Sequence, residues 1–206
     1  MIYVFGNSHA NTFTKTSPGT IGEWNQSGKF LSFSLGPIIA YNFTDHHYPK
    51  ILSILNQIDV KDSDYILFAV GEVDHRWHLP KRASMSQLPV EVVTNECVDR
   101  FFGSFIDLKN RGYKIIGWGS HPSTVGEHND DPGQPVFGDC LTRNLIGKTW
   151  NNRLSSLCSS SDIPFVSIFD DLVDEYGITK MEYYMDYCHL DPNKISGMLE
   201  KSFEKF

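Results

Sequence analysis

Residue types that support nucleophilic catalysis occur near both ends of the chain. Ser8 lies in the segment GNSHA (residues 6–10), directly after a short apolar run at residues 2–5. A serine hydroxyl becomes a nucleophile when a neighbouring histidine takes its proton and a third group orients that histidine. Asp186 and His189 are three residues apart in DYCH (residues 186–189), so one turn of chain could bring the carboxylate to one ring nitrogen while the other faces Ser8. We therefore predict a triad of Ser8, His189 and Asp186.

Each of these two segments also has a simpler interpretation. Serine often occupies turns and helix caps, and an Asp-x-x-His pair is common at the start of a helix or on a polar surface. The order of the residues along the chain favours the catalytic interpretation, but it does not fit an α/β-hydrolase. In that fold the serine lies deep in the chain, within G-x-S-x-G. Here the serine comes first, and Ala10 stands in place of the second glycine.

The elements that must position these residues follow from four short apolar runs. Continuous rather than alternating apolar residues indicate strands that are buried on both faces. The runs cover residues 2–5, 65–70, 113–118 and 165–169, and helices are expected at residues 49–58, 90–110 and 141–159. Strands that alternate with helices predict right-handed βαβ units around a parallel sheet. A last helix is expected at residues 194–205, and residues 30–35 fit either a short strand or an irregular segment.

Two long polar stretches, at residues 71–89 and 119–139, each follow a predicted strand. In open α/β sheets ligands bind beyond the carboxyl ends of the strands, so we expect the functional site in these loops. No linker or internal repeat interrupts the chain, and we expect a single domain over residues 1–206.

Composition argues against several classes of partner. A net charge of −7 disfavours nucleic acid and anionic membranes. No segment approaches the roughly 20 apolar residues of a membrane span and no signal-peptide pattern begins the chain, so we expect a cytoplasmic protein without membrane insertion. The four cysteines are scattered without a Cys-x-x-Cys motif, so reduced thiols are expected. We expect neither a metal nor another cofactor.

Together these segments resemble the SGNH (GDSL-type) hydrolases over nearly the whole chain. GNSH resembles the first block of the family, with Asn7 where aspartate is usual, and DYCH resembles the last. Gly36 matches the glycine of the second block, and GEVD (residues 71–74) resembles the third. The resemblance implies a single-domain three-layer α/β/α sandwich around a central, flavodoxin-like parallel sheet. It also implies that the backbone N–H groups of Ser8 and Gly36 bind the oxyanion.

One departure lies in the third block, where Val73 replaces the asparagine that usually donates to the oxyanion. Loss of one such donor typically costs roughly 100- to 1000-fold in rate. The longer segment GEVDHRWH (residues 71–78) is similar to a Gly-Glu-Ile-Asp-x-Arg-x-His variant of SGNH-like bacterial proteins associated with surface-glycan biosynthesis. That variant implies an oxyanion- or substrate-binding set made of Gly71, Glu72, Asp74, Arg76 and His78.

Arg76 and His121 extend this candidate site. The guanidinium of Arg76 has five N–H donors and could replace the missing amide or meet a substrate carboxylate. Its alternative is a structural ion pair with Glu72 or Asp74. His121 follows the third predicted strand, so we expect it to face the cleft; its alternative is a loop histidine that bonds to nearby backbone.

The leading hypothesis is a serine esterase that removes a small O-acyl group, and the family variant points to O-acetyl on a sugar or glycan. An acyltransferase would form the same acyl-enzyme and pass its group to an acceptor hydroxyl. Val73 motivates a third hypothesis, a catalytically weak domain that binds a glycan or a partner protein. A fourth, a metal-dependent hydrolase, would take its ligands from Asp74, His75, His78, His121 and His128.

Overall fold

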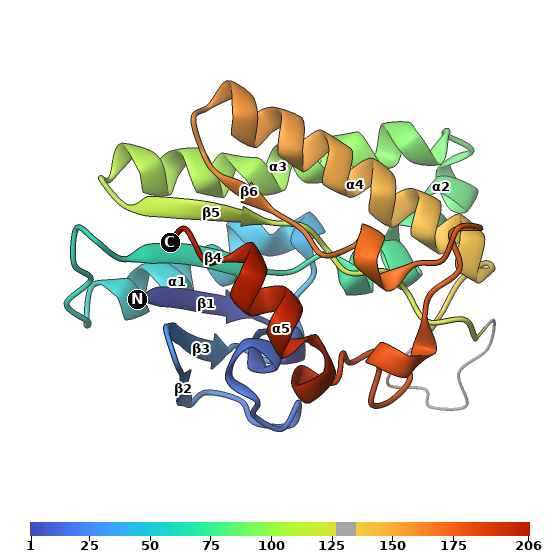
Figure 1. Cartoon of the computed structure of the whole chain (residues 1–206). Helices are drawn as coiled ribbons and strands as arrows, with labels where there is room; N and C mark the ends of the chain where they lie inside the picture. Colours follow the sequence, from blue (N-terminus) through green and yellow to red (C-terminus); the bar gives the residue numbers. More distant parts are fainter. Residues whose placement is uncertain (127–134) are drawn as a thin grey trace.

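One six-stranded sheet forms the centre of the molecule (Figure 1). The computed structural model describes residues 1–126 and 135–206. The sheet order is β2-β3-β1-β4-β5-β6, with β1 (Ile2–Gly6), β2 (Trp24–Ser27), β3 (Phe30–Ser34), β4 (Tyr65–Ala69), β5 (Lys114–Trp118) and β6 (Phe165–Val166). The expected α/β class is confirmed, with one correction. All neighbouring strands run parallel except the edge strand β2, which is antiparallel to β3 because the short turn between them can only form a hairpin.

Helices cover both faces of this sheet. They are α1 (Tyr48–Leu55), α2 (Leu79–Ser86), α3 (Val90–Asn110), α4 (Cys140–Ser160) and α5 (Pro192–Ser202), with shorter helical segments that include η1 (Ser8–Thr14) and η4 (Asp74–His78). The helices begin at recognisable signals. The Asp139 side chain caps α4 by accepting the backbone N–H of Thr142, and Asp191 caps α5 directly before a proline in its first turn.

Alternate residues of the central strands point into two separate cores. Tyr3 and Phe5 of β1 pack with α1, α3 and α4, whereas Ile2 and Val4 pack with η1 and α5. The same alternation holds along β4. Both faces of these strands are therefore buried, which explains their continuous apolar sequence. The result is the expected three-layer sandwich.

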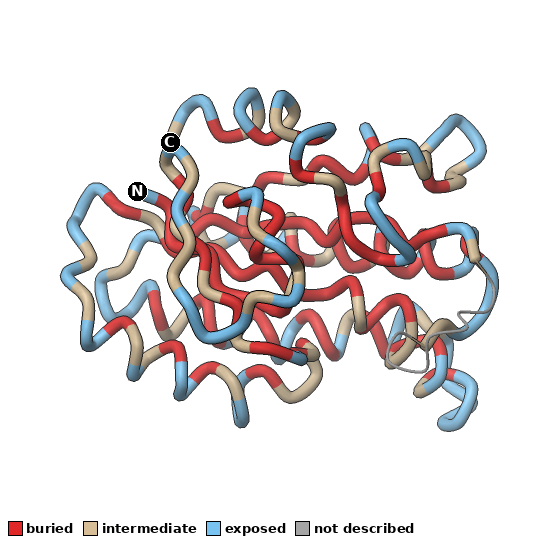
Figure 2. Tube along the Cα trace, turned by 90° about the horizontal axis from the view of Figure 1, so that it is seen from below, coloured by how far each residue is buried: buried red, intermediate tan, exposed pale blue. Residues whose placement is uncertain are grey.

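Figure 2 shows buried segments running through the middle of the molecule, with exposed residues at the outer turns and outer helix faces. Within residues 1–126 and 135–206, no helix is both long and apolar enough to cross a bilayer.

The polar stretch at residues 71–89 is not the loop that we expected. It contains η4 and α2, and α2 buries only one side, through Leu79 and Ala83. Apart from the buried Pro80, the remaining residues of α2 are polar or exposed, so an argument based on apolar runs does not detect this helix. The described parts of residues 119–139 are irregular, as expected, before α4 begins.

Candidate active site

Ser8 lies where the central strand β1 ends and η1 begins. Glycine is required at position 6, since a Cβ atom on Gly6 would lie 2.3 Å from the carbonyl oxygen of Ala69 on β4. Asn7 is extended (φ −80°, ψ −156°) and caps η1, because its side chain accepts the backbone N–H of His9 at 3.0 Å. The chain therefore turns sharply after β1 and presents the Ser8 hydroxyl at the carboxyl end of the parallel strands.

The DYCH segment forms a tight turn that directs His189 toward Ser8. Asp186 Oδ1 accepts the backbone N–H groups of Cys188 at 2.9 Å and of His189 at 2.7 Å. The second oxygen, Oδ2, lies 2.7 Å from His189 Nδ1, and His189 Nε2 lies 2.8 Å from Ser8 Oγ. Beside an ionised aspartate, Nδ1 carries the ring proton and Nε2 accepts the serine hydroxyl hydrogen. The fold thus brings His189 and Asp186 to Ser8, although Ser8 and His189 are 181 residues apart in the sequence.

The surroundings of this hydrogen-bonded chain favour a neutral histidine beside an ionised aspartate. Burial acts to raise the pKa of Asp186, but hydrogen bonds from the Cys188 and His189 backbone and from the His189 ring bring that pKa below its ordinary value. Burial and the neighbouring His9 lower the pKa of His189, with Asp186 opposing them. A neutral imidazole bonded to a serine hydroxyl is the state that a general base requires.

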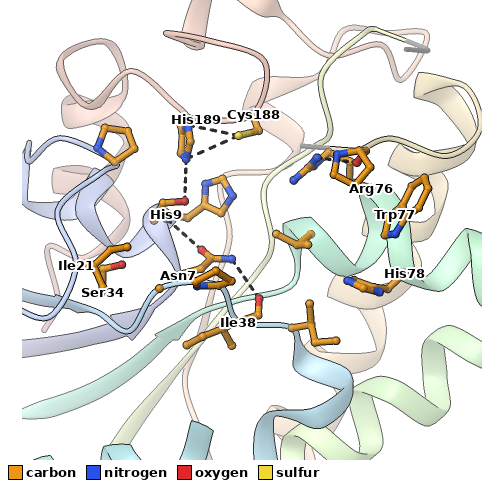
Figure 3. A pocket seen from close by; sticks show the side chains of 17 residues that line it. Asn7, His9, Ile21, Ser34, Ile38, Arg76, Trp77, His78, Cys188 and His189 are labelled. Atoms are coloured by element: carbon orange, nitrogen blue, oxygen red, sulfur yellow. Dashed lines mark hydrogen bonds between the residues drawn. The ribbon is translucent and has the colours of Figure 1, made fainter. Parts of the chain in front are cut away.

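Ser8 and His189 line a cavity of about 480 Å³ (Figure 3). Apolar and aromatic side chains form much of its wall: Ile21, Ile38, Ile39, Val73 and Trp77. Gly36 also lines it, in the left-handed region at φ 84°. Among the described residues, the backbone N–H groups of Ser8 and Gly36 have no hydrogen-bond acceptor, so both are available to an oxyanion.

Glu72 and Arg76 of the third block form a buried cluster with His9 beside the cavity. The buried Glu72 accepts from Arg76 Nε through Oε1 at 2.7 Å, and its Oε2 lies 3.1 Å from His9 Nε2. Burial acts to raise the pKa of Glu72, but the Arg76 charge and the His9 hydrogen bond hold it well below its ordinary value. Arg76 and His78 line the cavity, and Glu72 is not among the described residues that do so. Arg76 therefore both forms the structural ion pair and reaches the cavity.

Asp74 lies behind the cavity wall rather than on it. Its buried carboxylate accepts the backbone N–H groups of Ala40 at 2.8 Å and Tyr41 at 3.4 Å. Burial raises the pKa of Asp74 to about 7, although these hydrogen bonds oppose the shift. The contact ties η4 to the chain segment that directly follows the cavity residues Ile38 and Ile39.

His121 and Gly71 also lie behind the wall. The His121 Nε2 atom is 3.3 Å from the carbonyl oxygen of Cys188, and its ring lies 4.5 Å from that of His9. Burial lowers the pKa of His121 well below its ordinary value. Gly71 has φ 120°, and a Cβ atom there would meet the Ser120 side chain at 3.1 Å. Neither residue is among the described residues that line the cavity, although His121 contacts Cys188, which does line it.

Sequence reasoning missed His9. Its ring centre lies 5.0 Å from that of His189, on the same side of the cavity, and it links that residue to Glu72. The sequence indicates a role for His9 only through its position directly after Ser8. The partner Glu72 is 63 residues away, so the contact emerges only from the fold.

The metal ligands suggested by the sequence do not come together in the described chain. His75 is buried with Nε2 2.8 Å from Ser120 Oγ, away from the cavity, and His128 lies outside the described residues. Within the described ranges, the group that offers metal-ligand atoms within 4.8 Å of one another consists of His9, Cys188 and His189. Two of its members are already bonded to Glu72 and Ser8, which favours a proton-transfer site over a metal centre.

No family model and no curated protein matches the sequence, whereas solved structures do. A GDSL-like lipase from Bacteroides thetaiotaomicron has a TM-score of 0.64 at 13% identity, over 99% of this chain and 87% of that one. A catalytic mutant of an acetylxylan esterase from Geobacillus stearothermophilus has 0.60 at 11%, over 98% and 91%. Phospholipase A1 from Streptomyces albidoflavus has 0.53 at 10%, over 98% and 97%. The chain has the SGNH hydrolase fold.

This likeness covers nearly the whole of this chain and most of each neighbouring structure, so it concerns the entire architecture and not one motif. The three neighbours nevertheless carry the names of a lipase, a sugar esterase and a phospholipase. A shared SGNH fold at these identities therefore leaves the substrate to be argued from the site itself.

Proposed function

We propose that this chain is a serine esterase that removes a small O-acyl group, with acetyl on a sugar as the leading substrate. The observation that carries the proposal is the unbroken chain of hydrogen bonds from Asp186 through His189 to Ser8, 2.7 and 2.8 Å long, at the wall of a cavity of about 480 Å³. The names of the structural neighbours support ester hydrolysis as the reaction class.

The proposed reaction proceeds through an acyl-enzyme. Ser8 Oγ attacks the ester carbonyl carbon while its proton passes to His189 Nε2, and Asp186 stabilises the imidazolium that forms. The backbone N–H groups of Ser8 and Gly36 receive the negative oxygen. Collapse of the tetrahedral intermediate breaks the ester C–O bond, and His189 returns the proton to the departing alcohol. Water, deprotonated by His189, then cleaves the acyl-enzyme and releases the acid.

Because valine cannot donate a hydrogen bond, Val73 leaves this oxyanion site with one side-chain donor fewer than is usual in the family. Removing one such donor costs roughly 100- to 1000-fold in rate, so we expect slow turnover unless other contacts hold the substrate in position. The buried Glu72, Arg76 and His9 cluster limits the movement of the wall next to Val73.

The test is covalent labelling with a fluorophosphonate, measured as intact mass, because this probe reports an activated serine whatever the natural substrate is. We expect a single adduct on the parent and none on Ser8→Ala. A matched control is Ser120→Ala: Ser120 also bonds a histidine, but it is buried and should not react, so this variant should label like the parent. No adduct on well-folded parent protein would contradict the proposal and favour the binding-domain hypothesis.

A further inference from the structure

The cavity has an unusual charge distribution for a chain with 25 acidic residues and a net charge of −7. None of the described residues that line it is aspartate or glutamate. Arg76 is the charged side chain in the described lining, and His78 stands two residues further along the same wall. Nearby, Lys81 lies over the Trp77 ring at 4.6 Å from its centre and adds a second positive charge to this side. The described lining therefore offers an anion positive charge and no carboxylate, although the whole molecule carries a net negative charge.

Two hydrogen bonds hold the guanidinium of Arg76 in place and leave a third nitrogen able to donate to a ligand. Its Nε donates to Glu72 at 2.7 Å and its Nη1 donates to the carbonyl oxygen of Pro135 at 2.7 Å. Among the described residues, Nη2 has no acceptor. The side chain is only 4% exposed, and Figure 3 shows it directed into the cavity. A rigid, desolvated guanidinium with donors to spare suits a carboxylate, because little conformational entropy is lost when the ligand binds.

Glu72 does not cancel this preference. Its two oxygens are bonded to Arg76 Nε and His9 Nε2, and it is not among the described residues that line the cavity, so an anion in the cavity would meet the guanidinium and not this carboxylate. Burial, Lys81 and Arg76 lower the pKa of His78, which leaves that ring neutral and able to accept or donate a hydrogen bond. An anion on this wall would therefore meet donors and no carboxylate.

The position of Arg76 indicates which part of the substrate it meets. Figure 3 shows His189 and Arg76 at separate places around the cavity. The volume of about 480 Å³ exceeds what an acetyl group needs, so part of the alcohol enters as well. Resting on the esterase function proposed above, we propose that the substrate is an acylated sugar acid, whose alcohol part carries a carboxylate that binds Arg76 Nη2.

The test compares two esters that differ only in this group, acetylated glucuronic acid and the same acetate of glucose. The parent should show a kcat/KM that is roughly tenfold or more in favour of the acid, and Arg76→Gln should bring the ratio close to one. Arg82→Gln is the matched control because it also removes one positive charge. Arg82 lies on α2 and is not among the described residues that line the cavity, so this variant should keep the parent ratio. Equal rates on both esters in the parent, or a ratio that survives Arg76→Gln, would overturn the proposal.

A second measurement needs neither turnover nor a folded Arg76 variant. Glucuronate and glucose are titrated into the parent by calorimetry, and glucuronate should bind at least tenfold more tightly, with an affinity that falls as salt is added. Equal affinities would reject the carboxylate preference even if Ser8 reacts with the fluorophosphonate. Tight glucuronate binding without any Ser8 adduct would instead reject the esterase function and leave the carboxylate site standing.

Discussion

Asp186 uses its two carboxylate oxygens for different tasks, one to shape the DYCH turn and one to orient His189. Asn at this position could still accept both backbone N–H groups through its own oxygen. Its NH2 group would then face His189 Nδ1 and force the ring proton onto Nε2, where it blocks proton transfer from Ser8. The local structural role and the proposed catalytic role of Asp186 are therefore separable by one substitution.

We predict that Asp186→Asn folds like the parent and loses roughly 100- to 10,000-fold in kcat. The measurement is kcat on a simple acetate ester, with circular dichroism as the folding check. Asp191→Asn is the matched control: Asp191 caps α5 and asparagine caps equally well, so kcat should not change. A parental rate in Asp186→Asn would show that this carboxylate does not set the tautomer of His189.

The pH dependence of kcat/KM should report His189. In the proposed mechanism its neutral form is the base, so the rate should rise with pH as the ring loses its proton and reach a plateau above its pKa. Because burial and His9 lower this pKa, the midpoint should lie below the ordinary value of about 6.5. In Asp186→Asn the midpoint of the residual rate should move lower still, since the carboxylate is what opposes the shift. A parental midpoint at or above the ordinary value would contradict the buried setting of His189.

At the scale of elements, β1 and β4 approach so closely that position 6 tolerates only glycine. We predict that Gly6→Ala costs about 1–3 kcal/mol in unfolding free energy and slows fluorophosphonate labelling, because β1 must shift and Ser8 moves with it. Urea unfolding and labelling rates test this. Gly103→Ala is the control: no atom lies within 4 Å of the added methyl group, and in the interior of α3 alanine should stabilise by roughly 0.5–1 kcal/mol.

The elements differ in how far the sequence predicts them, for physical reasons. Strands such as β1 and β4 are buried on both faces, so their apolar runs are visible without any alignment. The expected bounds of α3 agree with the structure because a proline precedes it and Gly112 follows it. By contrast, α2 buries a narrow side, and its identity as a helix depends on packing that only the folded chain supplies.

The sequence also predicts the site only in part, and for the same reason: some contacts depend on packing in the folded chain. The three-residue spacing of Asp186 and His189 predicts a local turn, and the turn is present. The division of the third block into Arg76 on the cavity and Asp74 behind it cannot be predicted from residue types, because both are polar and only two positions apart. Which of them lines the cavity depends on the π-helical geometry of η4.

For the whole molecule, the site depends on bringing the two ends of the chain together. Ser8 starts η1 and His189 precedes α5, and one side chain that packs between these two elements is Phe203, directly after α5. Phe203 is fully buried and its ring packs against Phe13 of η1 at 6.1 Å and against Trp118 of β5 at 5.8 Å. These rings belong to the second core, which also contains Leu190, the residue directly after His189.

We predict that Phe203→Ala lowers the unfolding free energy by about 3–5 kcal/mol and also slows labelling of Ser8 under conditions where the variant remains folded. The second effect follows because the cavity left by the ring loosens η1 and α5 relative to each other, and with them the 2.8 Å contact between Ser8 and His189. Phe206→Ala, which removes a partly buried ring that contacts Phe203 and Tyr65, should lose less stability and keep its labelling rate. If both variants label at the parental rate while folded, the triad is positioned by its own turns alone, and the packing of the chain ends contributes stability but not catalytic geometry.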